Sequence, residues 1–124
     1  SRYDVIPLLK HFDQAYSFRR EFEYNNFMYV LAGIIIEKVS GLPWEQIVRD
    51  RIFVPIRMET SNTSLRQLQE FEDFSLPYSE IEGSIQPLTF NNLYAVNPAG
   101  GINSNIVDLM KWVRLQLSKD TVII

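Results

Sequence analysis

A helical period of apolar residues in segment 26–40 constrains the fold of this chain more than any other feature of its sequence. The apolar residues that recur at this spacing are Phe27, Val30, Leu31, Ile34, Ile35 and Val39. Side chains three and four positions apart share one face of a helix, so the pattern predicts an amphipathic helix. Gly41 follows directly, and glycine adopts the left-handed conformation that commonly ends a helix. We therefore expect one long helix that ends at Ser40.

Shorter helices and one hairpin are predicted on either side of this helix. Asp4 is a candidate cap for a first helix, Pro43 suits the first position of another, and Pro55 should end that one. A capping box at Ser64 marks a fourth helix, and an apolar stripe after Asn105 marks a fifth. The predicted segments are a helix at 4–12, a loop at 13–23, a helix that begins at Pro43 and is ended by Pro55, with Ile47, Val48, Ile52 and Phe53 on its inner side, a helix at 65–71, an irregular hairpin at 76–88 around Glu82-Gly83, and a helix at 105–118 whose stripe is Ile106, Leu109, Met110, Val113 and Leu117. The expected fold class is mainly α (α+β), with about four to five helices and a small irregular β-hairpin.

Composition and charge narrow the classes of function. Hydrophobic residues make up 46% of the 124 residues, which suffices for a packed core and excludes a disordered segment. No repeat or linker divides the chain, so residues 1–124 are expected to form a single domain. The net charge of −3 comes from interspersed acidic and basic residues, so there is no basic stripe for nucleic acid. The chain has no cysteine, which excludes disulfides and thiolate metal sites, and its longest apolar run, 30–36, is too short to span a membrane. No cofactor is expected.

The tripeptide Tyr24-Asn25-Asn26 is the strongest candidate for chemistry because it lies at the start of the long helix, where side chains can project into a cleft. A tyrosine titrates near ~10 and acts as a base only where a neighbouring cation stabilises its phenolate. The amide of Asn26 both donates and accepts hydrogen bonds, which suits it to orient a substrate carbonyl. When such a tripeptide is taken alone, a helix cap combined with a core aromatic explains it more often than a catalytic role does.

The surroundings of the tripeptide resemble a known family. Segment 23–41, EYNNFMYVLAGIIIEKVSG, closely resembles the Y-x-N helix of class C β-lactamase-like serine hydrolases. Segment 44–58, WEQIVRDRIFVPIRM, looks like the next helix of that family and its "IFEPLGM" end, with Ile56 and Arg57 where Leu and Gly are usual. Segment 97–104, NPAGGINS, followed by DLMKW at 108–112, looks like the "PAGG" turn and the helix after it. Even residues 1–4 resemble the segment after the family's "HTSGLP" stretch. The resemblance to serine β-lactamase-like and penicillin-binding-protein-like hydrolases therefore covers nearly the whole chain.

This resemblance implies roles for individual residues. In the family, a serine from an S-x-x-K motif is acylated by an amide or ester, the lysine and the Y-x-N tyrosine share proton transfer, and a K-T-G-like strand closes the opposite wall. By position, Tyr24 would be the general acid/base and Asn26 would orient the substrate. The turn would border the same cleft and bind substrate through Pro98, Ala99, Gly100 and Gly101. Glycines permit a ligand to approach the backbone closely, although a glycine-rich start of the next helix would explain the turn equally well.

Two motifs of the family are missing from this sequence. No S-x-x-K occurs, since segment 17–20 ends in arginine and segment 61–64 has no basic residue. No K-T-G occurs either, because aspartate separates the lysine and threonine of segment 119–121. In the family both motifs lie outside the matching segment. We therefore expect residues 1–124 to be the helical subdomain of a longer serine hydrolase that acts on a β-lactam, a peptide or an ester, and to be inactive alone and able to self-associate through the exposed subdomain interface. The alternative is a non-catalytic helical binding or scaffolding module.

The other polar and aromatic candidates have structural explanations. His11 is the single histidine and is expected at the surface of a short helix. The acidic stretch 70–73 is expected to be a solvated loop, because it lacks the spaced oxygen ligands and central glycine of a calcium loop. Trp44 and Trp112 lie among helical apolar stripes, which predicts packing in the core or at a subdomain interface.

Overall fold

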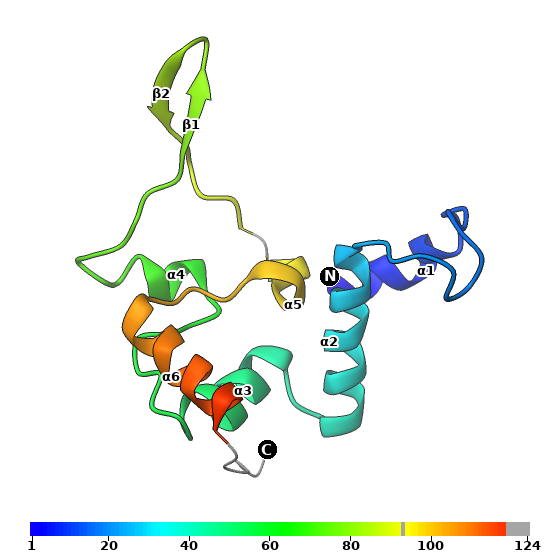
Figure 1. Ribbon diagram of the computed structural model, residues 1–124, viewed down its shortest axis with the longest axis horizontal. Coiled ribbons are helices and arrows are strands. Elements are labelled where there is room, and N and C mark those ends of the chain that lie inside the picture. The colour runs from blue at the N-terminus through cyan, green and yellow to red at the C-terminus, as the bar shows by residue number, and fades with distance from the viewer. Residues whose placement is uncertain (93, 119–124) are drawn as a thin grey trace.

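The computed structural model describes residues 1–92 and 94–118 (Figure 1). Its elements are η1 (Arg2–Asp4), α1 (Val5–Leu9), α2 (Asn26–Ser40), α3 (Trp44–Val48), η2 (Arg49–Phe53), α4 (Leu65–Leu68), β1 (Tyr78–Ile81), β2 (Ser84–Pro87), η3 (Tyr94–Val96), α5 (Asn97–Gly100) and α6 (Ile106–Leu117). This part of the chain contains six α-helices and one two-stranded sheet, which confirms the mainly α (α+β) fold class. Figure 1 shows α5 beside α2, and the hairpin projecting away from the helices. Segment 119–121, in which an aspartate separates the lysine from the threonine, lies outside the described residues.

Local signals determine both ends of α2. Asn25 is extended, and its side-chain oxygen accepts a hydrogen bond from the N–H of Phe27 at 2.8 Å. This bond satisfies one of the amides that a helix leaves free in its first turn. Gly41 ends the helix with φ of 72°, the left-handed conformation that favours glycine. The helix predicted at 26–40 is therefore confirmed at both ends.

The buried face of α2 differs from the predicted stripe. Val30, Gly33 and Ile34 are buried, whereas Ile35 is 55% exposed and Val39 is 84% exposed. The neighbouring elements α1, α3 and α5 contact the helix, and Gly33 lies at the contact with α5. The apolar period predicted the helix correctly, and the neighbouring elements of this chain cover only part of its apolar stripe.

The first helix is shorter than predicted and has a different cap. Ser1, not Asp4, caps η1 by accepting a hydrogen bond from the N–H of Tyr3 at 3.2 Å. The carboxylate of Asp4 is 2.6 Å from the terminal ammonium group of Ser1 and makes no cap at the start of α1. The α-helix then ends at Leu9 instead of residue 12.

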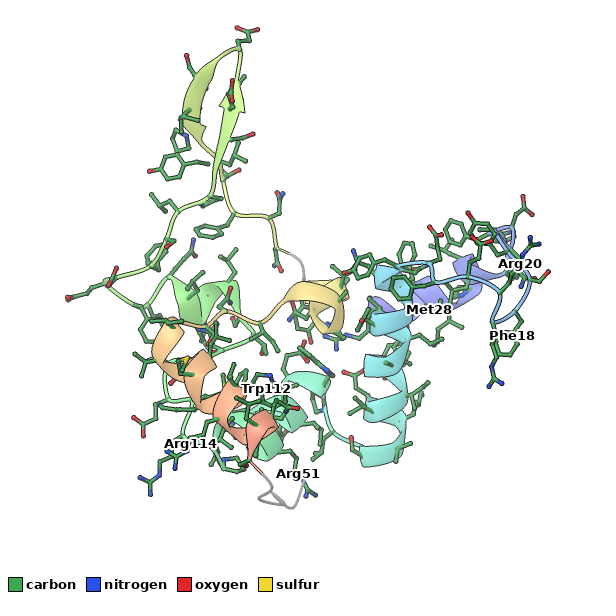
Figure 2. All side chains as sticks on the ribbon, viewed as in Figure 1. Phe18, Arg20, Met28, Arg51, Trp112 and Arg114 are labelled. Carbon is green, nitrogen blue, oxygen red and sulfur yellow. The ribbon has the colours of Figure 1, made fainter. Side chains whose placement is uncertain are left out.

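The segment between α1 and α2 contains no helix or strand, as predicted for 13–23. Phe18 is 82% exposed in this loop, and Figure 2 shows its ring at the far end of the molecule.

In the described part of the chain, no single helix is long and apolar enough to cross a membrane. One pair of segments, α2 and the continuous α3–η2 segment, is long and apolar enough when the two are taken together, but they are bent by 83° relative to each other.

The main hydrophobic core forms around α3 and η2. Its buried members are Trp44, Val48, Phe53 and Met58, with Ile52, Ile56 and Trp112 packed against them. Figure 2 places Trp112 of α6 over this region. The predicted inner positions Val48 and Phe53 are confirmed, as is core packing for both tryptophans. Pro43 occupies the position directly before α3 instead of its first helical position, and η2 is a π-helical turn that ends before Pro55.

The face of α6 that contacts the core is polar as well as apolar. Asp108 is 2% exposed, whereas Ile106 is 72% and Leu117 is 80% exposed. Asp108 accepts hydrogen bonds from Thr60 and Ser61, so this carboxylate and Trp112, one turn later, face the core. The helix at 105–118 is confirmed within one residue at each end, but its apolar stripe does not form the contact face. The remaining members of that stripe, which are also exposed, are Leu109, Met110 and Val113.

The hairpin and α4 follow turn and cap signals. Glu82 and Gly83 have φ of 52° and 78°, as a tight two-residue hairpin turn requires. The strands pair antiparallel, with Tyr78 opposite Pro87, which confirms the predicted hairpin. Ser64 caps α4, but this helix ends at Leu68 and residues up to 71 form turns, so the predicted helix at 65–71 was too long.

Candidate functional site

Tyr24 and Asn26 meet at the open end of α2. The hydroxyl of Tyr24 donates a hydrogen bond to Oδ1 of Asn26 at 2.7 Å. Tyr24 is 62% exposed, so it is not a core aromatic, and the capping bond is made by Asn25. The side chain of Asn26 is therefore free of the cap and remains exposed. The structure brings these two predicted site residues together.

Asn26 lies at one end of the packed face of α2. With 3.6 residues per turn, positions 26, 30, 33 and 37 fall within about 60° of each other around the helix axis. Val30 and Gly33 are buried on this face, and Glu37 is half-buried. Asn26 continues the same face into solvent. Any element that packs against Gly33 therefore lies on the side of the helix from which Asn26 projects.

The element packed there is α5, which contains the glycine-rich turn. A Cβ atom on Gly33 would lie 2.6 Å from Cβ of Pro98, so only glycine permits this approach of the two helices. At 1.5 Å per residue, Gly33 is about 10 Å along the axis from Asn26. The turn at Pro98 and the Tyr24–Asn26 pair thus lie on one side of α2, separated by two helical turns.

Two of the four predicted residues of the turn line a cavity. Gly100 and Gly101 contribute to a cavity of about 530 Å³, together with polar residues that include Asn91, Asn92 and Asn103. A Cβ atom on Gly101 would lie 2.7 Å from Cα of Asn97, whereas one on Gly100 would meet nothing within 4 Å. Pro98 and Ala99 do not line this cavity, and neither do Tyr24 and Asn26.

A larger cavity shares Glu45, Thr63 and Gln67 with this one, and none of the predicted site residues lines it. It measures about 780 Å³ and is lined by residues of α3, η2 and α4, including Arg49, Phe53 and Phe71. One of its lining residues is Ser61, whose hydroxyl donates a hydrogen bond to the carboxylate of Asp108 at 2.9 Å. The acceptor carboxylate of Asp108 is also bonded to Thr60 and Lys111, and the Tyr24–Asn26 end of α2 remains the candidate site.

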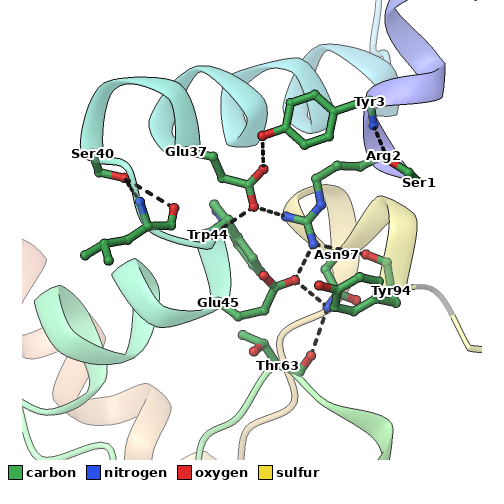
Figure 3. Close-up of polar contacts among 11 residues, drawn as sticks. Ser1, Arg2, Tyr3, Glu37, Ser40, Trp44, Glu45, Thr63, Tyr94 and Asn97 are labelled. Carbon is green, nitrogen blue, oxygen red and sulfur yellow. Dashed lines mark hydrogen bonds and ion pairs between the residues drawn. The ribbon is translucent and has the colours of Figure 1, made fainter.

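A buried ionic network joins the elements behind the candidate site (Figure 3). Arg2 is 4% exposed and donates to Glu37 at 3.1 Å, to Glu45, and to the carbonyl oxygen of Tyr94 at 3.2 Å. Glu37 also accepts from the backbone N–H of Trp44 at 3.0 Å. No motif in the sequence indicates this network. Its available signal was Glu37, a charged residue in an apolar helix seven positions after the buried Val30.

The network affects the titration of one of its members. The hydroxyl of Tyr3 donates to Oε2 of Glu37 at 2.9 Å. This hydrogen bond to a carboxylate raises the pKa of Tyr3, and partial burial and the negative charge of Glu37 act in the same direction. The positive charge of Arg2 opposes them.

A second polar cluster anchors α6. Burial alone would raise the pKa of Asp108, but hydrogen bonds from Lys111, Thr60 and Ser61 outweigh it and hold the pKa well below its ordinary value. Lys111 is 2.7 Å from the carboxylate. Asp108 is therefore charged at neutral pH and fully bonded, which identifies it as a structural anchor.

The other candidates remain apart from the site. His11 and the acidic residues of 70–73 are exposed. Across residues 1–92 and 94–118, no three His, Cys, Asp or Glu side chains are grouped so that they could hold a metal ion.

Solved structures with the same fold define the class of protein. The octameric penicillin-binding protein homologue from Pyrococcus abyssi matches with a TM-score of 0.87 and 27% identity, covering 100% of this chain and 28% of that one. D-amino acid amidase from Ochrobactrum anthropi SV3, complexed with L-phenylalanine, matches with a TM-score of 0.70 and 26% identity, covering 91% of this chain and 33% of that one. The fold is thus that of β-lactamase/transpeptidase-like proteins.

Sequence comparison then defines the family. The Beta-lactamase family profile matches residues 4–123, and the chain belongs to the beta-lactamase family. The unguisins hydrolase ungD' from Aspergillus campestris is 26% identical over 120 residues, which are 94% of this chain and 22% of the relative. The predicted resemblance to β-lactamase-like and penicillin-binding-protein-like hydrolases is confirmed. The chain spans between 22% and 33% of the length of these relatives.

Proposed function

We propose that this chain forms one wall of the active site of a longer serine hydrolase and has no activity by itself. In this proposal Tyr24 is the general acid/base and Asn26 orients the substrate. The observation that carries the proposal is the 2.7 Å hydrogen bond between the Tyr24 hydroxyl and Oδ1 of Asn26 at an exposed helix end. A proton-transfer group and an amide are thereby within reach of one substrate atom.

The position of α5 supports a shared cleft. Pro98 packs against Gly33, which lies on the same face of α2 as Asn26. Gly100 leaves open space where any other residue would place a side chain. We assign the substrate contacts of this wall to Pro98, Ala99, Gly100 and Gly101.

The nucleophile is proposed to come from outside these 124 residues. The sequence contains neither S-x-x-K nor K-T-G, and acyl transfer requires an activated nucleophile next to its base. The chemistry of the wall fits substrates whose carbonyl carbon a serine can attack to form an acyl-enzyme, namely β-lactams, peptides or esters. We expect the isolated chain to hydrolyse none of them above background.

The test uses the longer protein that we propose contains this segment. General acid/base groups contribute roughly 10²–10⁴-fold to rate, so Tyr24→Phe should lower kcat for ester hydrolysis, and the rate of acylation by a fluorescent penicillin, by at least about 100-fold. Tyr29→Phe is the matched control, because Tyr29 is also exposed on α2 and its ring centroid lies 6.2 Å from that of Tyr24. Unchanged rates in Tyr24→Phe would refute the assignment.

Self-association of the isolated chain is a second part of the proposal. Apolar side chains remain exposed on the outer faces of α2 and α6, among them Ile35, Val39, Ile106, Met110 and Leu117. Exposed apolar side chains of this kind favour association when nothing covers them. The molar mass measured by light scattering should therefore rise with protein concentration. A constant monomer mass up to the highest soluble concentration would contradict this part.

A further inference from the structure

The buried network fixes the glycine-rich turn to the rest of the molecule through one side chain. Asn97 begins α5, is 6% exposed, and uses both hydrogens of its amide. Nδ2 donates to Oε1 of Glu45 at 3.0 Å and to the carbonyl oxygen of Thr63 at 3.0 Å (Figure 3). The residue after Asn97 is Pro98, whose ring contacts Gly33. The turn is thus held by two hydrogen bonds on one side and by close packing on the other.

The anchor of Asn97 is itself tied to α2. Glu45 shares Arg2 with Glu37, and Glu37 lies on the same face of α2 as Asn26. A continuous chain of charge-assisted bonds therefore runs from α2 through Glu37, Arg2 and Glu45 to Asn97. Such bonds are directional and are stronger than neutral ones. They prevent α5 from sliding along α2 in a way that apolar packing alone does not.

We propose that Asn97 is a positioning residue that holds the glycine-rich turn at a set distance from the Tyr24–Asn26 pair. This inference rests on the proposed function, because it assumes that the turn contacts the substrate. Asn97 is 6% exposed, and both hydrogens of its amide are bonded within the protein, to Glu45 and Thr63. Its effect is to place the backbone from Pro98 to Gly101, so its loss should weaken substrate binding and leave proton transfer at Tyr24 largely unchanged.

The hydrogen bond between Asn97 and Glu45 can be inverted by an isosteric exchange. Asn97→Asp places an acceptor opposite the acceptor Oε1 of Glu45 and should displace α5. In the double variant, Glu45→Gln supplies a donor to the new carboxylate and the total charge returns to that of the wild type. Gln46→Glu is the matched control, because it adds one negative charge at an exposed neighbour of Glu45.

The variants are compared in the longer protein by KM and kcat for ester hydrolysis and by Tm. Because a hydrogen bond to a charged group is lost, Asn97→Asp should raise KM by about tenfold or more with kcat within about threefold of the wild type. The double variant should recover part of the rise in KM, because Glu45→Gln restores one of the two bonds while the carbonyl oxygen of Thr63 still faces a carboxylate. The control should leave both constants unchanged. If Asn97→Asp does not fold, Asn97→Ser replaces it, with a smaller expected rise in KM of about threefold.

Two results would overturn the proposal. One is an unchanged KM in the folded Asn97 variant. The other is a double variant that recovers Tm without recovering KM, because the network would then only stabilise the fold. Tyr24→Phe, measured in parallel, tests the proposed function separately. If Tyr24→Phe lowers kcat while the Asn97 variants leave KM unchanged, the proposed function stands and the positioning role falls.

Discussion

Adding one methyl group at Gly33 tests whether α5 packs against α2 as described. In Gly33→Ala the new Cβ atom would lie 2.6 Å from Cβ of Pro98 and 3.5 Å from Cδ1 of Trp44. The second distance is ordinary contact, but the first is shorter than two carbon atoms tolerate. Pro98 cannot relieve it by a change of rotamer, because its ring is joined to the backbone. Either α5 or α2 must therefore move.

Two effects of opposite sign determine the outcome. Alanine is favoured over glycine inside a helix by about 1 kcal/mol. Overpacking of a close contact costs about 1–3 kcal/mol, and the rigid proline ring places this site near the upper end. We therefore expect Gly33→Ala to lower the free energy of unfolding by about 2 kcal/mol.

Urea denaturation followed by circular dichroism measures this change. Ala32→Gly is the control, because Ala32 is the exposed neighbour of Gly33 and reports the helix propensity term alone, a loss of about 1 kcal/mol. In a Pro98→Gly background, which removes both ring atoms, Gly33→Ala should instead be stabilising. A Gly33→Ala protein more stable than the wild type would refute the described contact between the two helices.

Three further predictions concern single side chains. Because the pKa of Asp108 is lowered in the folded state, its contribution to stability is complete above its ordinary pKa near ~4 and is lost as the pH falls below it. Asp108→Asn should therefore lower the free energy of unfolding by about 2–3 kcal/mol at pH 7 and flatten its decline between about pH 4 and 2; equal decline in both proteins would contradict this. Because the pKa of Tyr3 is raised, its contribution to stability is present below about pH 10 and is lost above it. Subtracting the ultraviolet titration of Tyr3→Phe from that of the wild type should therefore show a phenol that ionises above the usual pH range. A midpoint at the usual value would exclude the bond to Glu37. Asn25→Ala should remove the α2 cap and cost about 1 kcal/mol in urea denaturation, and an unchanged midpoint would contradict the capping bond.

Elements determined by short-range signals could be predicted from the sequence. The bounds of α2 follow from an amide cap at Asn25 and a left-handed stop at Gly41. The hairpin follows from Glu82-Gly83, where two consecutive positive φ angles are required. Each signal acts over a few residues, and its energy does not depend on which part of the chain packs nearby. The Tyr24–Asn26 bond is of the same kind, because its partners are two residues apart.

Contacts between distant segments could not be predicted in this way. The exposed Val39 and Leu117 belong to regular apolar periods, yet the core forms on other faces of their helices. An apolar period shows that a helix has a stripe, but it does not show which element covers it. Likewise, a buried arginine is stable only where carboxylates surround it, and those that bind Arg2 come from positions 37 and 45.

The sequence by itself determined the helix that carries Tyr24 and Asn26, the hairpin, and the membership of the beta-lactamase family. The tertiary structure decided that α5 lies on the same side of α2 as Asn26. That placement depends on the fit of Pro98 against Gly33 and on the bonds from Asn97 to Glu45 and Thr63. These partners are 34 to 65 positions apart, and only the folded chain brings them within contact distance.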